Sequence, residues 1–291
     1  MSLAFKKPAF EVPVINDDFD LPRKDFDFFA KKMFELSGVN LPFSSKNEAL
    51  VKNRMSKLMR RLKVTDIDEL RNVVESEDRK VIQEFISALT TNKTHFFREE
   101  AHFDFLKNYL KGHFQKPQDL RIWCAAASTG QEPYTLAICV QEALNPSQLA
   151  RTKILATDID LQVLQKATNG IYTESEMEGL PGYLQKKYFH RLEGKQEVWQ
   201  ANDELNKMIR FAPFNLVHND HKFQTQFHLI FCRNVLIYFD PPTTAQVIDF
   251  LADQLSPEGY LILGHSESGA MKCPKVKPLA RAVYQKIVGS K

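Results

Sequence analysis

Glycine is scarce in this chain, with 11 among 291 residues, and no segment has the G-x-G-x-x-G spacing of dinucleotide-binding folds. A nicotinamide-dependent oxidoreductase is therefore disfavoured. Long apolar runs are also absent. No stretch approaches the roughly 18 apolar residues that a membrane-spanning helix needs, and the first residues, MSLAFKKPAF, lack the apolar core of a signal peptide. We therefore expect a cytoplasmic protein without membrane insertion.

Cysteines are few and dispersed. Cys124, Cys139, Cys232 and Cys273 show neither C-x-x-C spacing nor a clustered histidine, so we expect reduced thiols, no disulfide and no metal. The excess of positive charge is only +3, which gives no support to nucleic-acid binding by the whole chain. Any electrostatic recognition has to come from a local patch.

Residues 24–89 show helical periodicity, with turns predicted at 37–40 and 64–66. One helix of this region is strongly basic. Its apolar residues recur at helical spacing at Val51, Met55 and Leu58, and other faces carry Arg54, Lys57, Arg60 and Arg61. Two interpretations stay open, because periodicity cannot separate them: a solvated charged face, or a docking surface for an acidic helical partner or nucleic acid.

After residue 100, strand-like and helix-like segments alternate, which predicts an α/β fold with a doubly wound sheet. Short connections between the last strands predict an antiparallel edge. The region 170–207 is too long for a plain loop and predicts an inserted subdomain, helical first and then a β-hairpin around 194–199. The predicted strands are 121–126, 153–157, 209–214, 227–232, 259–264 and 282–287, and the predicted helices are 132–144, 161–168 and 243–255.

The segment 121–138, RIWCAAASTGQEPYTLAI, predicts a buried strand, a turn of very small residues and a helix. Because the turn 125–130 has little side-chain bulk, a ligand can lie against its backbone and the N–H groups of the helix terminus. A pyrophosphate would not be expected beside a fixed carboxylate, whereas Glu132 suits a cationic cofactor. The segment therefore favours S-adenosylmethionine.

Polar residues follow the other predicted strands, and ligands of doubly wound sheets bind beyond the carboxyl ends of the strands. Asp158, after the second strand, can accept hydrogen bonds from a ribose diol. A cap or turn role explains each such residue singly, but their agreement over several strand ends predicts one site. The remaining residues are Asn215 and Leu216 after the third strand, predicted beside an adenine ring, and Arg233, Asn234 and Tyr238 after the fourth.

Five segments together resemble the chemotaxis receptor methyltransferases of the CheR family. They are TTNKTHFFRE at 90–99, ASTGQEPY at 127–134, ATDID at 156–160, IFCRNVLIYFD at 230–240 and GHSES at 264–268. The resemblance covers nearly the whole chain. The sequence departs from the family at Ala126 and Ala127, where a Gly-Cys pair is frequent, and at Gln131, where glutamate is usual.

The resemblance implies a class I methyltransferase fold, Rossmann-like with an antiparallel edge, over residues 90–291, preceded by a helical substrate-docking domain at 1–89. It implies methyl transfer from S-adenosylmethionine to glutamate carboxylates of methyl-accepting chemotaxis receptors, with S-adenosylhomocysteine as the product. The implied enzyme is a monomer. It binds the helical cytoplasmic domain of the receptors and no nucleic acid. The cofactor residues implied are Asn92, Thr94, Arg98, Glu132, Asp158, Asn215, Leu216, Arg233 and Asn234.

A glutamate substrate is ionised at neutral pH, with a reference pKa of about 4.3, so it needs positioning rather than a general base. Arg98 is the candidate for holding the carboxylate, because a guanidinium offers a planar fork of donors. Tyr238 is the second candidate, through its hydroxyl.

The sequence offers two alternatives to this activity. The tripeptide Asp240-Pro241-Pro242 is similar to a motif of amine methyltransferases, but Thr243 stands where that motif has an aromatic residue, so a proline-rich helix start is the better interpretation. A non-catalytic protein that binds S-adenosylmethionine and acts as a receptor adaptor is the second alternative.

Overall fold

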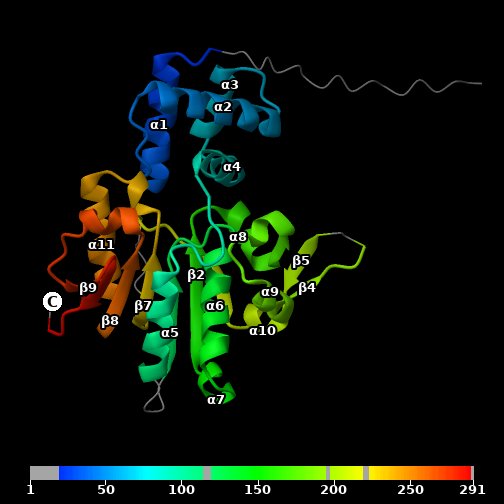
Figure 1. The fold of residues 1–291 in the computed structure, drawn as a ribbon. Coiled ribbons are helices and arrows are strands. Elements are labelled where there is room, and N and C mark those ends of the chain that lie inside the picture. Colours follow the sequence, from blue (N-terminus) through cyan, green and yellow to red (C-terminus); the bar gives the residue numbers. More distant parts are fainter. Residues whose placement is uncertain (1–19, 114–118, 195–196, 219–222, 290–291) are drawn as a thin grey trace, which may run out of the picture. The chain divides into compact units, whose positions relative to one another are not determined.

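The computed structural model describes residues 20–113, 119–194, 197–218 and 223–289 (Figure 1). The chain forms two compact units. One takes in the described residues up to Lys32 and Leu41–Leu89, and the other takes in Met33–Asn40 and the described residues from Thr90 onward. Among the described residues, no helix is long and apolar enough to cross a bilayer.

The first unit is built from helices that each bury apolar side chains. Ser44 caps α2 by accepting from the N–H of Asn47, and Asp66 caps α3 by accepting from the N–H of Glu69. The turns predicted at 37–40 and 64–66 lie between helices, as expected. The helices are α1 (Arg23–Ser37), whose last turn belongs to the second unit, α2 (Ser45–Leu62), α3 (Ile67–Glu75) and α4 (Arg79–Leu89).

The second unit contains a seven-stranded sheet in the order β6-β2-β1-β7-β8-β10-β9. The first five of these strands are parallel, and β10 is antiparallel to both β8 and β9. The predicted doubly wound sheet with an antiparallel edge is therefore confirmed. The strands are β1 (Leu120–Cys124), β2 (Thr152–Asp158), β6 (Ile209–Pro213), β7 (Phe227–Cys232), β8 (Leu255–Leu263), β9 (Val276–Ala280) and β10 (Val283–Lys286).

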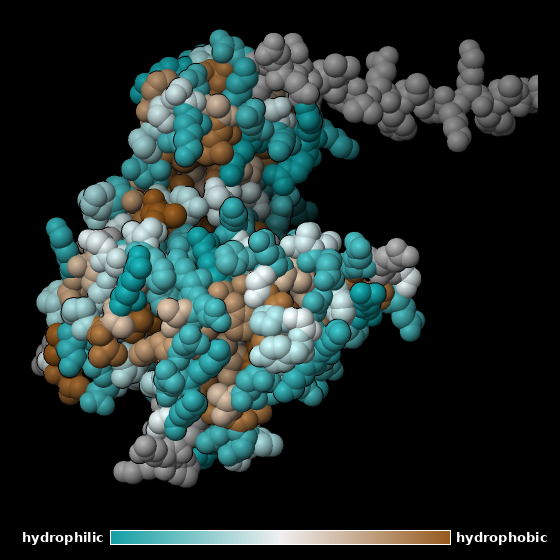
Figure 2. Space-filling view, in the orientation of Figure 1, coloured by the Kyte–Doolittle hydropathy of each residue, from teal (hydrophilic) through white to brown (hydrophobic). Residues whose placement is uncertain are grey.

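Helices cover both faces of this sheet because successive side chains of a strand point to opposite sides. Along β1, Ile122 joins the core formed with α5 and α6, whereas Trp123 joins the core formed with α11. Hydrophilic side chains cover much of the surface visible in Figure 2. The helices are α5 (Ala101–His113), α6 (Gln131–Ala143), α7 (Pro146–Leu149), α8 (Leu161–Asn169) and α11 (Pro241–Gln254).

The start of α11 settles the interpretation of the proline pair. Asp240 caps the helix by accepting from the N–H of Thr243 at 2.9 Å, and Pro241 and Pro242 occupy the first two helical positions. Proline fits there because the first N–H groups of a helix have no partner within it. The tripeptide is a helix start, as the sequence indicates.

The inserted subdomain is a three-stranded antiparallel sheet in the order β3-β5-β4. The predicted hairpin is confirmed as β4 (Phe189–Arg191) with β5 (Val198–Ala201), although residues 195–196 lie outside the described residues. The expectation that the insert begins with a helix is wrong. It begins with β3 (Ile171–Thr173), which is followed by a short 3₁₀ helix, α9 (Gly182–Tyr188) and, after β5, α10 (Asp203–Asn206).

Two strands, β3 and β9, were not predicted from the sequence pattern, each for a different reason. Strand β3 has three residues, too few to show a period, and is held by the buried Tyr172, whose hydroxyl donates to the carbonyl of Thr129 at 2.8 Å. Strand β9 is a mostly exposed edge strand that contains Pro278, a residue that strand patterns avoid away from edges.

Candidate functional site

The turn between β1 and α6 has the small residues that its backbone requires. Gly130 has φ +99°, and a Cβ there would lie 2.5 Å from the hydroxyl oxygen of Tyr172. Ser128 also has positive φ, at 50°, and its hydroxyl donates to the carbonyl of Asn92 at 3.0 Å. The backbone of this turn is thereby brought to the carboxyl end of β1, with little side-chain bulk over it.

Asp158, at the end of β2, faces the same turn. Its carboxylate accepts from the N–H of Ser128 at 2.8 Å and from the N–H of Asp160 at 3.0 Å. Burial raises the pKa of Asp158 to about 6, although both hydrogen bonds act to lower it. The side chain therefore changes charge close to neutral pH.

Asn92 is held near the end of β2 by a hydrogen bond to the buried Asp160. Its amide donates to the Asp160 carboxylate at 2.9 Å, and the hydroxyl of Thr90 donates to the same oxygen. Asp160 also accepts from two N–H groups at the start of α8. Thr94 lies half-buried in the same turn. The segment before α5 is thus fixed to the end of β2.

The guanidinium of Arg233, at the end of β7, joins two carboxylates. Its side chain is 1% exposed; Nη1 pairs with Glu132 and Nη2 lies 3.1 Å from Glu99. Nη2 also donates to the carbonyl of Arg98. Burial alone would raise the pKa of Glu99, but the Arg233 charge and hydrogen bonds outweigh it and lower that pKa. Glu132 is therefore ion-paired, and its other oxygen accepts from the thiol of Cys124 at 3.2 Å.

Glu267, in the GHSES segment, holds the turn that follows Arg233. It is 2% exposed and accepts from the N–H groups of Asn234 at 2.8 Å, Gly264 at 2.6 Å and Leu236 at 2.7 Å. Asn234 has φ +59°, a conformation that costs a non-glycine residue on the order of 1 kcal/mol. Glu99 and Glu267 both lie in segments that resemble the family, but the sequence alone predicted a site role for neither residue.

Among the described residues, four of the nine non-glycine residues with positive φ lie in this region. Besides Ser128 and Asn234, Phe97 has φ +53° and Glu99 has φ +57°. Such strain persists only where the surroundings hold it, and it is commonest at functional sites.

The two predicted catalytic residues come from different segments. Arg98 is half-buried, and its Nη1 donates to the carbonyl of Lys93 at 2.9 Å. Tyr238 is half-buried and ends a short 3₁₀ helix after β7. Its carbonyl accepts from the N–H of Asn40 at 2.8 Å.

The segment Met33–Asn40 fastens two strand-end loops of the same unit. The amide of Asn215 donates to the carbonyl of Leu36 at 2.8 Å, and Val39 forms a bridge with Phe239. The carboxamide oxygen of Asn215 accepts from two N–H groups of its own turn, and the neighbouring Leu216 is buried. The structure thus gives Asn215 a fastening role, and its predicted place beside an adenine stays a prediction.

The basic residues of α2 divide into two groups. Arg54 donates to the carbonyl of Ala88 at 3.1 Å, and Arg61 pairs with Glu84 at 3.1 Å, so both serve the packing of α2 on α4. Lys57 and Arg60 are exposed.

Glu99, His102 and His265 bring possible metal ligands within 4.8 Å of one another. Burial, followed by the Arg233 charge, lowers the pKa of His102 to about 4, so its ring is neutral at physiological pH. A divalent cation bound to Glu99 would compete with Arg233 for the same oxygen. Our expectation of no metal stays a prediction.

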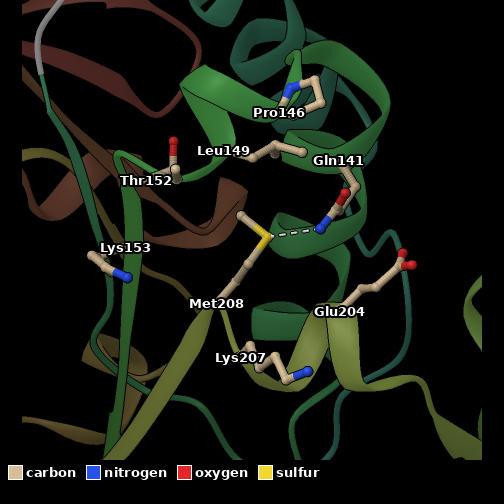
Figure 3. Close-up of a pocket in the computed structure, with 9 residues that line it drawn as sticks. Gln141, Pro146, Leu149, Thr152, Lys153, Glu204, Lys207 and Met208 are labelled. Atoms are coloured by element: carbon tan, nitrogen blue, oxygen red, sulfur yellow. Dashed lines mark hydrogen bonds between the residues drawn. The ribbon is translucent and has the colours of Figure 1, made fainter.

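An open cavity of about 490 Å³ lies at the other end of the strands (Figure 3). Thr152, at the start of β2, and Met208, just before β6, contribute to its lining, and the Gln141 amide donates to the Met208 sulfur at 3.2 Å. It is therefore separate from the cluster at the carboxyl ends.

A doubly wound sheet with a small-residue turn and acidic groups at its strand ends is shared by several ligand-binding folds, and the match to a family model identifies it here as the class I fold of S-adenosylmethionine-dependent methyltransferases. Two family models match this chain: "CheR methyltransferase, SAM binding domain" over residues 92–281 and "CheR methyltransferase, all-alpha domain" over residues 24–90. The chain belongs to the CheR methyltransferase family.

Curated relatives agree with this assignment. Chemotaxis protein methyltransferase 2 of Pseudomonas aeruginosa is 36% identical over 270 residues, which cover 92% of this chain and 95% of the relative. The chemotaxis protein methyltransferase of Escherichia coli is 38% identical over 221 residues, covering 75% and 76%. That of Borreliella burgdorferi is 34% identical over 261 residues, covering 87% and 91%.

Substitution of Gly38 tests how much the segment Met33–Asn40 contributes to stability. Gly38 has φ +75°, and a Cβ there would lie 2.5 Å from Cγ2 of Val217. We expect Gly38→Ala to lower the free energy of unfolding by about 1–2 kcal/mol, because alanine fits neither the backbone nor the space. Urea denaturation followed by circular dichroism measures this.

Gly112→Ala is the matched control. Its Cβ would meet no described atom within 4 Å, and alanine is favoured over glycine inside a helix by up to about 1 kcal/mol. Equal stability of Gly38→Ala and the wild type would show that the segment Met33–Asn40 can shift without loss of stability.

Proposed function

We propose that this protein transfers the methyl group of S-adenosylmethionine to glutamate side chains of chemotaxis receptors and forms methyl esters there. Family membership supports the cofactor and the reaction class. The observation that carries the proposal is the meeting of the small-residue turn, Asp158 and the Glu132–Arg233–Glu99 network at one end of the sheet.

The charges of this network suit the cofactor. Two carboxylates surround one guanidinium, so the network has a net charge of −1 with all three groups ionised. S-adenosylmethionine supplies an electrophilic methyl group on a positively charged sulfonium. We propose that Glu132 and Asp158 hold the cofactor directly and that Arg233 orients Glu132. The other proposed cofactor residues are Asn92, Thr94, Arg98, Asn215, Leu216 and Asn234.

The role of this chain towards the substrate is alignment. An ionised glutamate is already a nucleophile, and correct placement can contribute on the order of 7–11 kcal/mol to catalysis. We propose that Arg98 holds the carboxylate and that the Tyr238 hydroxyl donates to it or lines the path of the methyl group.

We further propose that residues 1–89 dock the receptor and residues 90–291 perform the transfer in a cytoplasmic monomer. The proposed contacts for an acidic receptor helix are the basic residues Arg54, Lys57, Arg60 and Arg61 of α2, among which Lys57 and Arg60 are exposed.

Labelling tests the reaction directly. The protein is incubated with receptor-bearing membranes and S-adenosylmethionine carrying a labelled methyl group, and the modified peptides are mapped by mass spectrometry. We expect base-labile methyl esters on glutamate. Methyl groups on amines would overturn the proposed substrate, and cofactor binding without transfer would favour the adaptor alternative.

Asp158 should make cofactor binding depend on pH. Its pKa of about 6 means that the carboxylate predominates above pH 6 and the acid below it. Because the ionised form accepts hydrogen bonds from a ribose diol, affinity for S-adenosylhomocysteine should fall up to about tenfold for each pH unit below 6. Calorimetry between pH 5 and pH 8 measures this. Asp158→Asn should bind weakly with a flatter profile, and the same profile in both proteins would exclude Asp158 as the titrating group.

Tyr238→Phe and Arg98→Lys separate chemistry from binding. Loss of one hydrogen bond to a charged group costs about 1.5–3 kcal/mol, so Tyr238→Phe should lower kcat about tenfold or more with little change in cofactor affinity. Arg98→Lys should also be poor, since an ammonium does not replace a fork of donors. Wild-type turnover in both variants would remove their proposed roles.

Charge reversal tests docking. Lys57→Glu with Arg60→Glu should sharply reduce receptor methylation at low salt, because complementary charge speeds association. Affinity for S-adenosylhomocysteine should stay at the wild-type level. Arg79→Glu with Lys80→Glu, at the exposed start of α4, makes the same charge change on the same unit and is the control. Equal methylation by the two double variants would indicate a merely solvated face.

A further inference from the structure

We infer that Glu99 is a positioning residue that shares Arg233 with Glu132, and that its charge raises the affinity for positively charged S-adenosylmethionine relative to the affinity for the neutral product. This inference rests on the proposed cofactor site. It concerns how one carboxylate, not itself among the proposed ligand contacts, changes the charge that the cofactor meets.

The two ends of the guanidinium have different partners. Nη1 of Arg233 pairs with Glu132, and Nη2 pairs with Glu99 at 3.1 Å. Without the Glu99 charge, Arg233 and Glu132 would form a neutral pair. With it, one negative charge remains, spread over groups whose carboxylate side chains are 17% and 12% exposed.

The neighbouring groups do not cancel this charge. His102 is 3.5 Å from Glu99, but burial and Arg233 keep its ring neutral. His265 bonds Glu99 through its backbone N–H at 3.1 Å, and Asn234 donates its side-chain amide at 3.4 Å. Arg98 meets Arg233 only through its carbonyl, while its guanidinium donates to Lys93.

The two cofactor forms differ by one positive charge. S-adenosylmethionine has a sulfonium where S-adenosylhomocysteine has a neutral thioether, and the rest of the two molecules is shared. Loss of shape or of hydrogen bonds in the site would lower the affinity for both ligands. Loss of a negative charge would lower mainly the affinity for the cationic ligand. At the effective dielectric constant of a partly buried site, a unit charge several ångströms away corresponds to about tenfold in affinity.

The test is calorimetry of Glu99→Gln with three ligands: S-adenosylmethionine, S-adenosylhomocysteine and sinefungin, an analogue with an ammonium group near the position of the sulfonium. The quantity compared is the ratio of affinities for the cationic and neutral ligands. We expect both cationic ligands to weaken about tenfold relative to S-adenosylhomocysteine. Glu100→Gln, the same change at the exposed next residue, should leave the ratio unchanged, and Glu99→Asp should retain it because the charge is kept.

A second variant guards against misfolding of the first. His265→Lys adds a positive charge beside Glu99 and leaves the backbone N–H bond in place, so it should shift the ratio in the same direction as Glu99→Gln. Circular dichroism checks the fold of each variant. Equal weakening of all three ligands, or an unchanged ratio in both variants, would overturn the inference and leave the cofactor proposal standing. Failure of the wild type to bind either cofactor form would overturn both.

Discussion

The buried guanidinium of Arg233 is the group on which the site depends. It lies between Glu99, from the turn before α5, and Glu132, from the first turn of α6. A buried charge that loses its partner costs several kcal/mol, so these segments have to meet at the end of β7. Its contact with the carbonyl of Arg98 places a predicted catalytic residue beside the same group. One charge thus joins segments that are more than 130 residues apart in the chain.

Some residues of this site have strained backbone conformations, and hydrogen bonds to carboxylates hold two of them in place. Asn234 adopts positive φ directly after Arg233, and three backbone N–H groups around it bond to Glu267. Ser128 adopts positive φ in the turn after β1 and bonds through its N–H to Asp158. These two strained residues are therefore each matched to an acid on a neighbouring segment. Such an arrangement keeps the site rigid before any ligand arrives.

Local pattern was enough to predict the alternating strands and helices, the turn of small residues and the acidic strand ends. Each of these is written in a continuous stretch of the chain. The Glu99 and Glu267 contacts, the fastening of Asn215 by Leu36 and the division of the basic residues of α2 all depend on partners far away in the sequence. The pairing of Glu132 with Arg233 likewise joins residues that are far apart in the sequence. The spacing of residues in the sequence does not show which arginine will form an ion pair with a buried glutamate.

The proposed methyl transfer to a glutamate carboxylate explains why so much of the structure fixes positions. An ionised carboxylate needs no proton removed, so no group here has to be tuned as a general base. What limits the rate is alignment and the charge around the reacting atoms. The buried side chains of this site accordingly serve to hold backbone turns and one guanidinium, whereas Arg98 and Tyr238 remain half-buried at its edge. The partial exposure of these two proposed catalytic residues suits the proposed substrate, which is itself a protein side chain.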